Sequence, residues 1–316
     1  MTGSPSTLLA RWPSANPQAA IPVLGRALTT SRPGLSTGRR AVQIRPLRLP
    51  ASEAHGKEGR NMYVARALDG QSEKVEVFVE NPAAPLRSAG QGRDRKGKGK
   101  AVEGEKDGDD DDLMIVEKDG TEQEEGGALG PSRWTHCSVG IPPGMAGMAP
   151  GGLYDTFIQR ALFAPPQPGG QPPQRDQSYW QPRAQAVSIE GYSFIVGAQA
   201  GAQSAEWEVK VGSVGLKGGT ASGTTKGCII EVTYLPVPYL PVNSTFVKDF
   251  LLSLFPPQAV RNGEIEILDL PEELFIGAGL LDPPDADKDE EEGEWAWRDK
   301  HTTFAYVHQF KKEGLL

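Results

Sequence analysis

The stretch WEVKVGSVGLKGGTASGTTKGCIIEVTYLP, from Trp207 to Pro236, decides the fold. Gly218 and Gly223 have the spacing of a phosphate-binding loop, but Thr224 stands where such a loop carries its lysine. The loop would also need a helix after it, whose N-terminus holds the phosphate, whereas CIIEVTYL alternates as a strand does. The stretch therefore predicts a hairpin, in which a flexible glycine-rich loop joins two strands.

The first strand of this hairpin changes its apolar phase. Trp207 and Val211 belong to one alternating series, and after Gly212 the apolar positions move to Val214 and Leu216. Glycine inside a strand often marks a β-bulge. The phase change therefore predicts a bulge at Gly212.

The charge balance argues against a general nucleic-acid-binding protein. The 316 residues include 33 Lys and Arg against 41 Asp and Glu, a formal net charge of -8. Non-specific affinity for nucleic acid comes from neutralising phosphates with basic side chains, and the sequence shows no basic stripe. It also lacks a secretory apolar core at the N-terminus and any run of eighteen apolar residues. We therefore expect a soluble intracellular protein with no membrane contact and no direct sequence-specific binding of nucleic acid.

The cysteine content supports neither a disulfide framework nor a zinc site. The two cysteines, Cys137 and Cys228, lie far apart, and Cys228 has the position of a buried strand residue. The glycosylation-like triplet Asn243-Ser244-Thr245 is then better explained as the cap of a helix.

Composition divides the chain into one interrupted domain. Residues 1–82 form the first part of a β-rich domain, residues 83–150 a disordered insertion rich in charge, Gly and Pro, and residues 151–316 the remainder of the same domain. A second acidic loop is predicted at 282–294. Both acidic segments interrupt an otherwise patterned chain.

Periodicity assigns the remaining elements. Strands are predicted at 41–47, at 186–196 and in a second hairpin over 61–82 around Asp69-Gly70, and helices at 16–28, 153–163, 243–255 and 302–312. Because hairpins connect most of the strands, we expect an α+β fold, with an antiparallel sheet and helices at one face or end.

Two of the helices carry distinctive residues. In the first, Asn16 is the predicted cap and Pro17 the first residue, but Pro22 would strain the helix and move its start. The helix at 243–255 has one apolar face, which we predict to be buried: Phe246, Val247, Phe250, Leu251, Leu254 and Phe255. On the last helix Phe304, Val307 and Phe310 could face a partner, although core positions are the simpler assignment.

The sequence offers few groups for catalysis. The four histidines, His55, His136, His301 and His308, lack a paired carboxylate motif and are interpreted as surface or partly buried residues. No nucleophile elbow occurs. We therefore predict no catalytic, cofactor-binding or metal-binding residue.

Two carboxylate pairs leave an alternative open. Glu206 with Glu208, and Glu264 with Glu266, form E-x-E patterns on predicted strands, so that each pair lies on one face. Such pairs could hold Mg²⁺ or Mn²⁺ for phosphate hydrolysis. The same pattern is also that of an amphipathic strand with its charged face in water, which is common in antiparallel sheets.

The insertion contains two address-like elements. Residues 93–100, RDRKGKGK, have the composition of a nuclear-import patch or of an ordinary lysine-rich linker. A short β-prone run between acidic residues has the shape of a SUMO-interaction motif, or else packs back onto the parent domain: Leu113, Met114, Ile115 and Val116.

The hairpin also carries a family resemblance. EWEVKVGSV, the small-residue loop and GCIIEVTYLP, with IEGYSF before and FVKDFLLSLF after, resemble the Mediator subunit 20 family, here a fungal-type member with insertions. The signature residues of this resemblance are Glu206, Trp207, Val211, Gly212, Val214, Gly227, Glu231 and Tyr234. Trp207 replaces the usual Phe, and the insertion after Pro82 and the loop before Trp295 are longer than the family needs.

The resemblance implies a fold and a role. The fold is an antiparallel β-barrel-like sheet with flanking helices, and the role is that of a non-enzymatic, nuclear subunit of the Mediator head, a coregulator of RNA polymerase II. The implied partners are Mediator subunit 18, as a heterodimer, and the C-terminal helix of subunit 8. The barrel is also reminiscent of tunnel-shaped RNA triphosphatases, so a metal-dependent phosphohydrolase using the E-x-E pairs is the alternative.

Overall fold

The computed structural model describes residues 3–50, 59–69, 72–81, 133–141, 180–197, 205–241, 243–281 and 297–316. All of these belong to one compact unit, built from Met1–Pro82 and Ser132–Leu316, and residues 83–131 lie outside the described residues. The import-like patch at 93–100, the motif at Leu113–Val116, the helix predicted at 153–163, the acidic loop at 282–294 and His55 also lie outside them.

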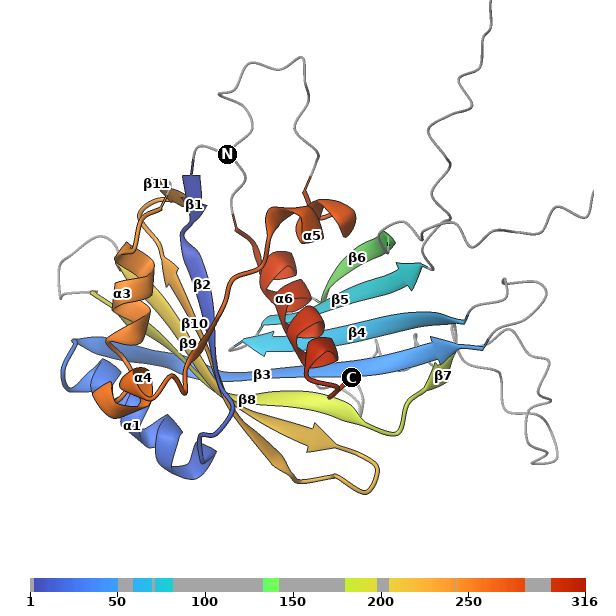
Figure 1. Ribbon diagram of the computed structural model, residues 1–316, viewed down its shortest axis with the longest axis horizontal. Helices are drawn as coiled ribbons and strands as arrows, with labels where there is room; N and C mark the ends of the chain where they lie inside the picture. The colour runs from blue at the N-terminus through green and yellow to red at the C-terminus, as the bar shows by residue number, and fades with distance from the viewer. Residues whose placement is uncertain are drawn as a thin grey trace, which may run out of the picture. The chain divides into compact units, whose positions relative to one another are not determined.

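One large antiparallel sheet dominates this unit (Figure 1). Its described strands follow the order β12-β2-β10-β9-β8-β3-β4-β5-β6, with β7 paired to β3. The small pair β1 (Gly3–Pro5) and β11 (Tyr239–Pro241) is separate. The strands of the large sheet are β2 (Thr7–Trp12), β3 (Gly34–Leu49), β4 (Arg60–Asp69), β5 (Ser72–Asn81), β6 (Arg133–Ile141), β7 (Gln181–Pro182), β8 (Ala186–Val196), β9 (Trp207–Lys217), β10 (Thr225–Tyr234) and β12 (Glu266–Leu268).

The sheet is open, so the predicted barrel-like closure is wrong. Among the described strands, β12 and β6 form the two ends of the path and do not pair with each other. Closure would require these edges to meet. Instead, one face of the sheet packs onto a buried helix, α6 (Asp299–Lys312), which fills the space that a barrel interior would occupy.

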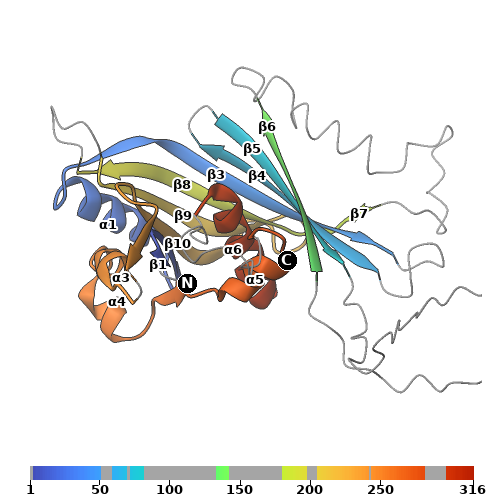
Figure 2. The same cartoon turned by 90° about the horizontal axis from the view of Figure 1, so that it is seen from above.

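Helices cover both faces of the sheet rather than one. The helices α1 (Pro17–Thr29), α3 (Phe246–Leu252) and α4 (Pro257–Arg261) pack with one apolar cluster, and α5 (Glu272–Gly277) and α6 with the other. Figures 1 and 2 show the two groups at different parts of the sheet. Within the described residues, no helix is long and apolar enough to cross a bilayer.

The two clusters explain the phase change in β9, and the predicted bulge at Gly212 is wrong. From Trp207 to Lys217, β9 pairs with β8 in continuous register. The register shift of this hairpin lies in β10 instead, between Thr225 and Cys228. Trp207, Val209 and Val211 belong to the apolar cluster that α1, α3 and α4 cover, here called the α1 cluster. Val214 and Leu216 belong to the apolar cluster that α5 and α6 cover, here called the α6 cluster. The apolar phase changes because the covered face changes along one regular strand.

A pair of glycines lies where the covered face changes. Gly191 of β8 is directly opposite Gly212 of β9. A Cβ on Gly191 would lie 1.8 Å from the Val211 carbonyl oxygen, and one on Gly212 would lie 2.4 Å from Cγ2 of Ile189. The backbone of β9 therefore leaves no room for a side chain at Gly191, and the Ile189 side chain leaves none at Gly212.

Most of the other predicted elements are confirmed. The helix α1 begins at Pro17, and the Asn16 side chain accepts a hydrogen bond from the Gln18 N–H at 3.1 Å. Pro22 lies inside this helix without moving its start. Asp69 lies opposite Ser72, which confirms the hairpin of β4 and β5.

The structure confirms the core assignment of the last helix and corrects part of that of α3. Phe304, Val307 and Phe310 are fully buried, so the last helix is core and not a partner surface. The helix α3 ends at Leu252, three residues earlier than predicted, with Thr245 at its N-cap position. Val247, Leu251, Leu254 and Phe255 are buried as predicted, but Phe246 is exposed.

The disordered segment predicted for 83–150 extends too far, because Arg133–Ile141 forms β6. This strand pairs with β5 along its full length. Its flanks are rich in Gly and Pro, so composition alone predicts disorder there, but RWTHCSVGI itself alternates in a way suited to a strand. Trp134 and His136 both contact aromatic residues of the α6 cluster.

We predict that Gly191→Ala destabilises the protein by about 3 kcal/mol, since the added carbon meets the backbone of β9 and cannot be relieved by a rotamer change. Urea unfolding followed by circular dichroism measures this loss. Gly140→Ala is the matched control, because a Cβ there has no atom within 4 Å. Equal stability of the two variants would contradict the close approach of β8 and β9.

Candidate protein-interaction site

The hairpin of β9 and β10 sends its signature residues to opposite faces of the sheet. Trp207 lies directly opposite Tyr234, and Lys210 lies directly opposite Glu231. The first pair belongs to the face covered by α1 and α3, and the second to the face covered by α6. The signature therefore contributes to two distinct sites.

The first site is an aromatic cluster at one end of the hairpin. The Trp207 ring stacks on Phe250 of α3, with centroids 3.8 Å apart and planes 4° apart. Tyr234 and Phe246 lie 4.8 and 5.1 Å from Trp207 and meet each other edge to face. The Arg32 guanidinium lies 4.3 Å from the Phe250 centroid. Such contacts between aromatic rings, and between arginine and a ring, fix the position of α3 on the sheet.

Exposed apolar residues continue this cluster to the surface. Phe246 is 47% exposed, and the segment after β10 exposes Leu235 by 43% and Val237 and Tyr239 by 37% each. We call these four residues the aromatic surface. The Leu235 N–H donates to the Glu206 carbonyl at 2.9 Å, and β11 pairs with β1, so the backbone at both ends of the segment is fixed. Exposed apolar residues grouped over rigid aromatics are typical of protein interfaces.

The second site is a buried ionic cluster around the Glu231 carboxylate. Its Oε2 lies 2.9 Å from both Nη1 of Arg40 and the hydroxyl of Tyr306. Its Oε1 accepts from the Thr302 hydroxyl at 3.3 Å and from the Lys210 ammonium at 3.4 Å. The cluster thus connects β10, β9, β3 and α6.

The side chains of this cluster determine one another's protonation states. Burial alone would raise the pKa of Glu231, but the charges of Lys210 and Arg40 and the hydrogen bonds from Tyr306 and Arg40 outweigh it and lower that pKa to about 2. Burial and the neighbouring carboxylate raise the pKa of the Tyr306 hydroxyl. The carboxylate is therefore ionised and the phenol neutral at any physiological pH, which suits a structural clamp rather than proton transfer.

The carboxylate pairs do not form one site, and the prediction that all four glutamates lie on strands is wrong. Glu206 and Glu264 lie just outside β9 and β12. Glu208 lies opposite Thr233 of β10. Glu266 lies opposite Arg11 of β2, which in turn lies opposite Ile229 of β10. Thr233 and Ile229 are four residues apart, so the two carboxylate pairs are separated by about 14 Å along the strand direction. Glu206 lies in a bend, and Gly263, just before Glu264, has a φ of 68°, so in each pair the strand begins only after the first glutamate.

Three of these four carboxylates, those of Glu208, Glu264 and Glu266, have a nearby partner. The Lys210 ammonium lies 3.1 Å from Glu208, and the Lys312 ammonium 3.4 Å from Glu266. The Trp12 indole N–H donates to Glu264 at 3.1 Å. Among the described residues, no group of three or more His, Cys, Asp or Glu side chains is arranged to hold a metal ion.

Of the described histidines, His136 and His308 are partly buried as predicted, and only His301 is more buried than predicted. His301 is fully buried; its Nδ1 accepts from the Arg298 N–H at 2.9 Å, and its Nε2 lies 3.2 Å from the Leu280 carbonyl, to which it donates. Burial lowers the pKa of His301 to about 4. His136 lies on β6 with Nε2 2.5 Å from Glu76, and burial lowers the pKa of His308. These contacts are structural.

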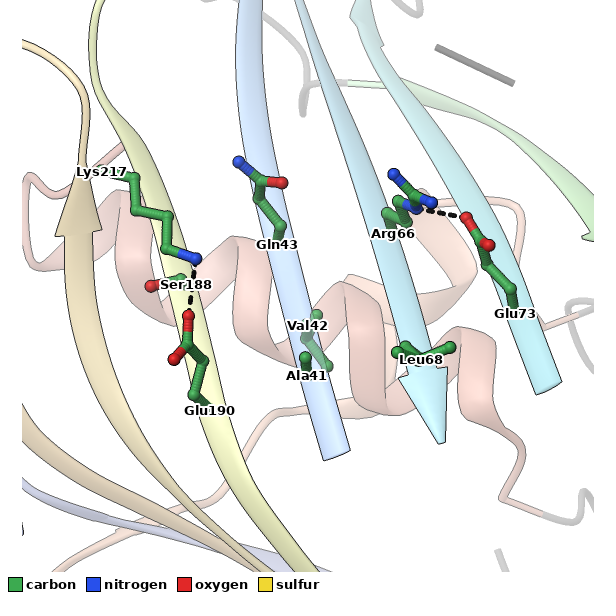
Figure 3. Close-up of a pocket in the computed structure, with 9 residues that line it drawn as sticks. All are labelled: Ala41, Val42, Gln43, Arg66, Leu68, Glu73, Ser188, Glu190 and Lys217. Carbon is green, nitrogen blue, oxygen red and sulfur yellow. Dashed lines mark hydrogen bonds and ion pairs between the residues drawn. The ribbon is translucent and has the colours of Figure 1, made fainter. Parts of the chain in front are cut away.

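A pocket of about 270 Å³ lies on the face of β8, β3 and β4 that is turned away from α6 (Figure 3). Its floor includes Ala41, and Gln43 stands in its centre. An ion pair flanks it on each side: Arg66 with Glu73, and Lys217 with Glu190. Because each charge has an opposite charge beside it, the pocket offers no unbalanced charge to a substrate.

The sequence pointed to only part of this arrangement. It identified Trp207, Glu231 and Tyr234 but not Arg40, Lys210, Thr302 or Tyr306, which complete the ionic cluster. The available hint was Lys210, a charged residue between buried valines in a strand that is covered on both faces. Cys228 is buried and Cys137 is exposed, and both are free thiols as predicted.

Comparisons with known proteins add little to this geometry. No protein-family model and no curated protein matches the chain. The chain is similar to the PH1819 protein from Pyrococcus horikoshii OT3, with a TM-score of 0.29 and 9% identity over 85% of this chain and 94% of that one. It is also distantly similar to a chain in the Schizosaccharomyces pombe Mediator head module, with a TM-score of 0.27 and 7% identity over 83% of this chain and 96% of that one. At these TM-scores, neither likeness carries an argument about fold or function.

We predict that Glu231→Gln destabilises the protein by about 4 kcal/mol, because it leaves the buried Arg40 guanidinium without the carboxylate that it contacts, while Lys210 keeps only Glu208. Chemical denaturation at pH 7 gives the difference. The control is Glu190→Gln, which removes an exposed ion pair with Lys217 and should cost less than about 1 kcal/mol. If both variants were equally mild, the cluster would not hold α6 on the sheet.

A pH dependence follows from His301. Its folded-state pKa of about 4 lies below the ordinary value of 6.5, so the unfolded chain binds the extra proton first as the pH falls. Stability from this residue is complete above pH 6.5 and decreases toward pH 4. We expect His301→Gln to flatten the stability profile in this range, as measured by urea unfolding at a series of pH values; identical slopes for the two proteins would contradict the assignment.

Proposed function

We propose that this chain is a non-enzymatic, protein-binding subunit of the Mediator head module, which acts as a nuclear coregulator of RNA polymerase II. The aromatic surface is the observation that carries the protein-binding role. The resemblance of the signature residues to the Mediator subunit 20 family supplies the choice of assembly. The proposed partners are Mediator subunit 18, in a heterodimer, and the C-terminal helix of subunit 8.

The aromatic surface has the properties of a preformed docking site. Phe246 and Tyr239 are exposed aromatics, and the Phe246 ring lies 5.1 Å from Trp207, which stacks on Phe250, so Phe246 has little freedom to lose on binding. Large, rigid aromatic side chains contribute most of the binding energy in typical interfaces. This surface, rather than the core helix α6, is where we expect the partner.

The ionic cluster supports the same role indirectly. It holds α6 against β3, β9 and β10 through hydrogen bonds to a single carboxylate. A carboxylate fully occupied by Arg40, Lys210 and Tyr306 has no free position for a substrate or a metal ion. The signature residue Glu231 therefore serves the stability of the hairpin that presents Trp207 and Tyr234.

Co-expression of the full chain with Mediator subunit 18 and the C-terminal segment of subunit 8 tests the proposal. We expect a stable stoichiometric complex in size-exclusion chromatography with light scattering. Phe246→Asp should weaken this complex by at least about thirtyfold, the effect of losing a residue worth about 2 kcal/mol.

The matched control is Leu68→Asp, at a residue of β4 that is also exposed but lies away from the aromatic surface. This variant should assemble as the unchanged protein does. A chain that stays alone in the presence of both partners would rule out the proposed function, and equal binding by the two variants would rule out the aromatic surface as the contact.

A further inference from the structure

Among the strands that the structure describes, β6 forms one of the two edges of the large sheet. It pairs with β5 from Asn81↔Arg133 to Glu73↔Ile141 and is last in the order of described strands. Thr135 and the run from Cys137 to Gly140 are exposed. Because glycine has no side chain, the exposure of Gly140 is exposure of backbone. An edge of this kind has backbone N–H and C=O groups available for another strand.

This edge lacks the features that usually prevent such pairing. Proteins protect their edges with short strands, prolines, lysines or bulges. The opposite edge, β12, is only three residues long. The strand β6 has nine residues, RWTHCSVGI, with neither proline nor lysine, and its register with β5 is regular throughout.

The edge is also held rigidly in position. Trp134 lies 5.8 Å from Tyr63 and 5.4 Å from Phe304 of α6, centroid to centroid. His136 lies 4.9 Å from Phe78 and bonds to Glu76. These contacts anchor one face of β6, so an incoming strand would meet an extended backbone that is already ordered.

The sequence of β6 is complementary to itself in an antiparallel arrangement. If two copies pair around a two-fold axis at Cys137, the central residue, then Thr135 lies opposite Val139 on one face. On the other face Trp134 lies opposite Gly140, where the ring can cover the bare glycine backbone. Paired β-branched residues and an aromatic beside a glycine are favourable cross-strand neighbours.

We propose that β6 is a homodimerisation edge, on which the β6 strand of a second copy of this chain pairs in antiparallel register centred on Cys137. The two sheets then form one continuous sheet. This contact is separate from the aromatic surface, since β6 is at the end of the strand order farthest from β2 and β12. The inference does not depend on the proposed function.

The chain provides its own probe of this register. Directly opposed residues in an antiparallel pair have Cα atoms about 4.5–5.5 Å apart, within the range that a disulfide spans. The only other cysteine, Cys228, is buried, and burial raises its pKa to about 11. Two Cys137 thiols from opposed copies would therefore be oxidised by diamide to one disulfide, while diamide takes up the two hydrogens.

The experiment treats the full chain with diamide and measures the disulfide-linked dimer on a non-reducing gel, with light scattering of the untreated protein beside it. We expect a dimer by light scattering and conversion of most of the chain to the linked form. In the matched control, Cys137→Ser with Ser138→Cys, each thiol lies two residues away from the position opposite the other, about 8 Å apart, and linking should fall at least tenfold.

A second pair of variants keeps the test independent of cysteine chemistry. Thr135→Lys with Val139→Lys places like charges on an exposed edge and should give a monomer without loss of fold, whereas Phe246→Asp should leave the dimer intact. A monomer at 100 µM for the unchanged protein, or equal linking by both cysteine positions, would overturn the proposal.

Discussion

The Glu231 carboxylate is the interaction on which the rest of the structure depends. Removing a carboxylate from water costs several kcal/mol, so a buried one persists only where cations and hydrogen-bond donors surround it. Here Arg40, Lys210, Tyr306 and Thr302 do so from two other strands and the last helix. A displacement of α6, β3 or β9 would leave a buried charge uncompensated. The cluster therefore specifies one relative position for elements that lie far apart in the sequence.

The second constraint is that the central strands are covered on both faces, but at different points along their length. In β8 and β9 the buried positions change parity near Gly191 and Gly212. The α1 and α3 side is packed by aromatic rings, and the α6 side combines an apolar cluster with the ionic one. Because α6 fills the inner face, the sheet need not close on itself, and both of its edges remain separate.

Local features of the fold could be predicted from the sequence, and long-range ones could not. The hairpin of β9 and β10 follows from alternation and turn residues, and the start of α1 from Asn16 and Pro17, because these depend on neighbours in sequence. The bulge assigned to Gly212 was wrong because one strand's pattern does not reveal which face is covered at each point. Openness of the sheet depends on the packing of α6, and the length of β6 was hidden by its Gly- and Pro-rich flanks.

The candidate site shows the same division. Trp207 and Tyr234 were identified by resemblance, but the exposure of Phe246 depends on how α3 lies on the sheet, and helical periodicity alone assigned it to the core. The partners of Glu231 come from residues up to 191 positions away, as with Arg40, and no spacing rule connects them. Conversely, the two E-x-E pairs follow the same pattern in the sequence, but in the structure they do not form one site, and Glu206 and Glu264 lie outside the strands.

Hydrogen exchange tests the central claim, that this chain is a protein-binding subunit whose contact is the aromatic surface, most directly. The exchange of backbone amides would be measured for the chain alone and mixed with Mediator subunit 18. The account predicts new protection concentrated in residues 234–246, with α6 unchanged because it is already buried. Protection that appears elsewhere, or no difference between the two samples, would contradict it.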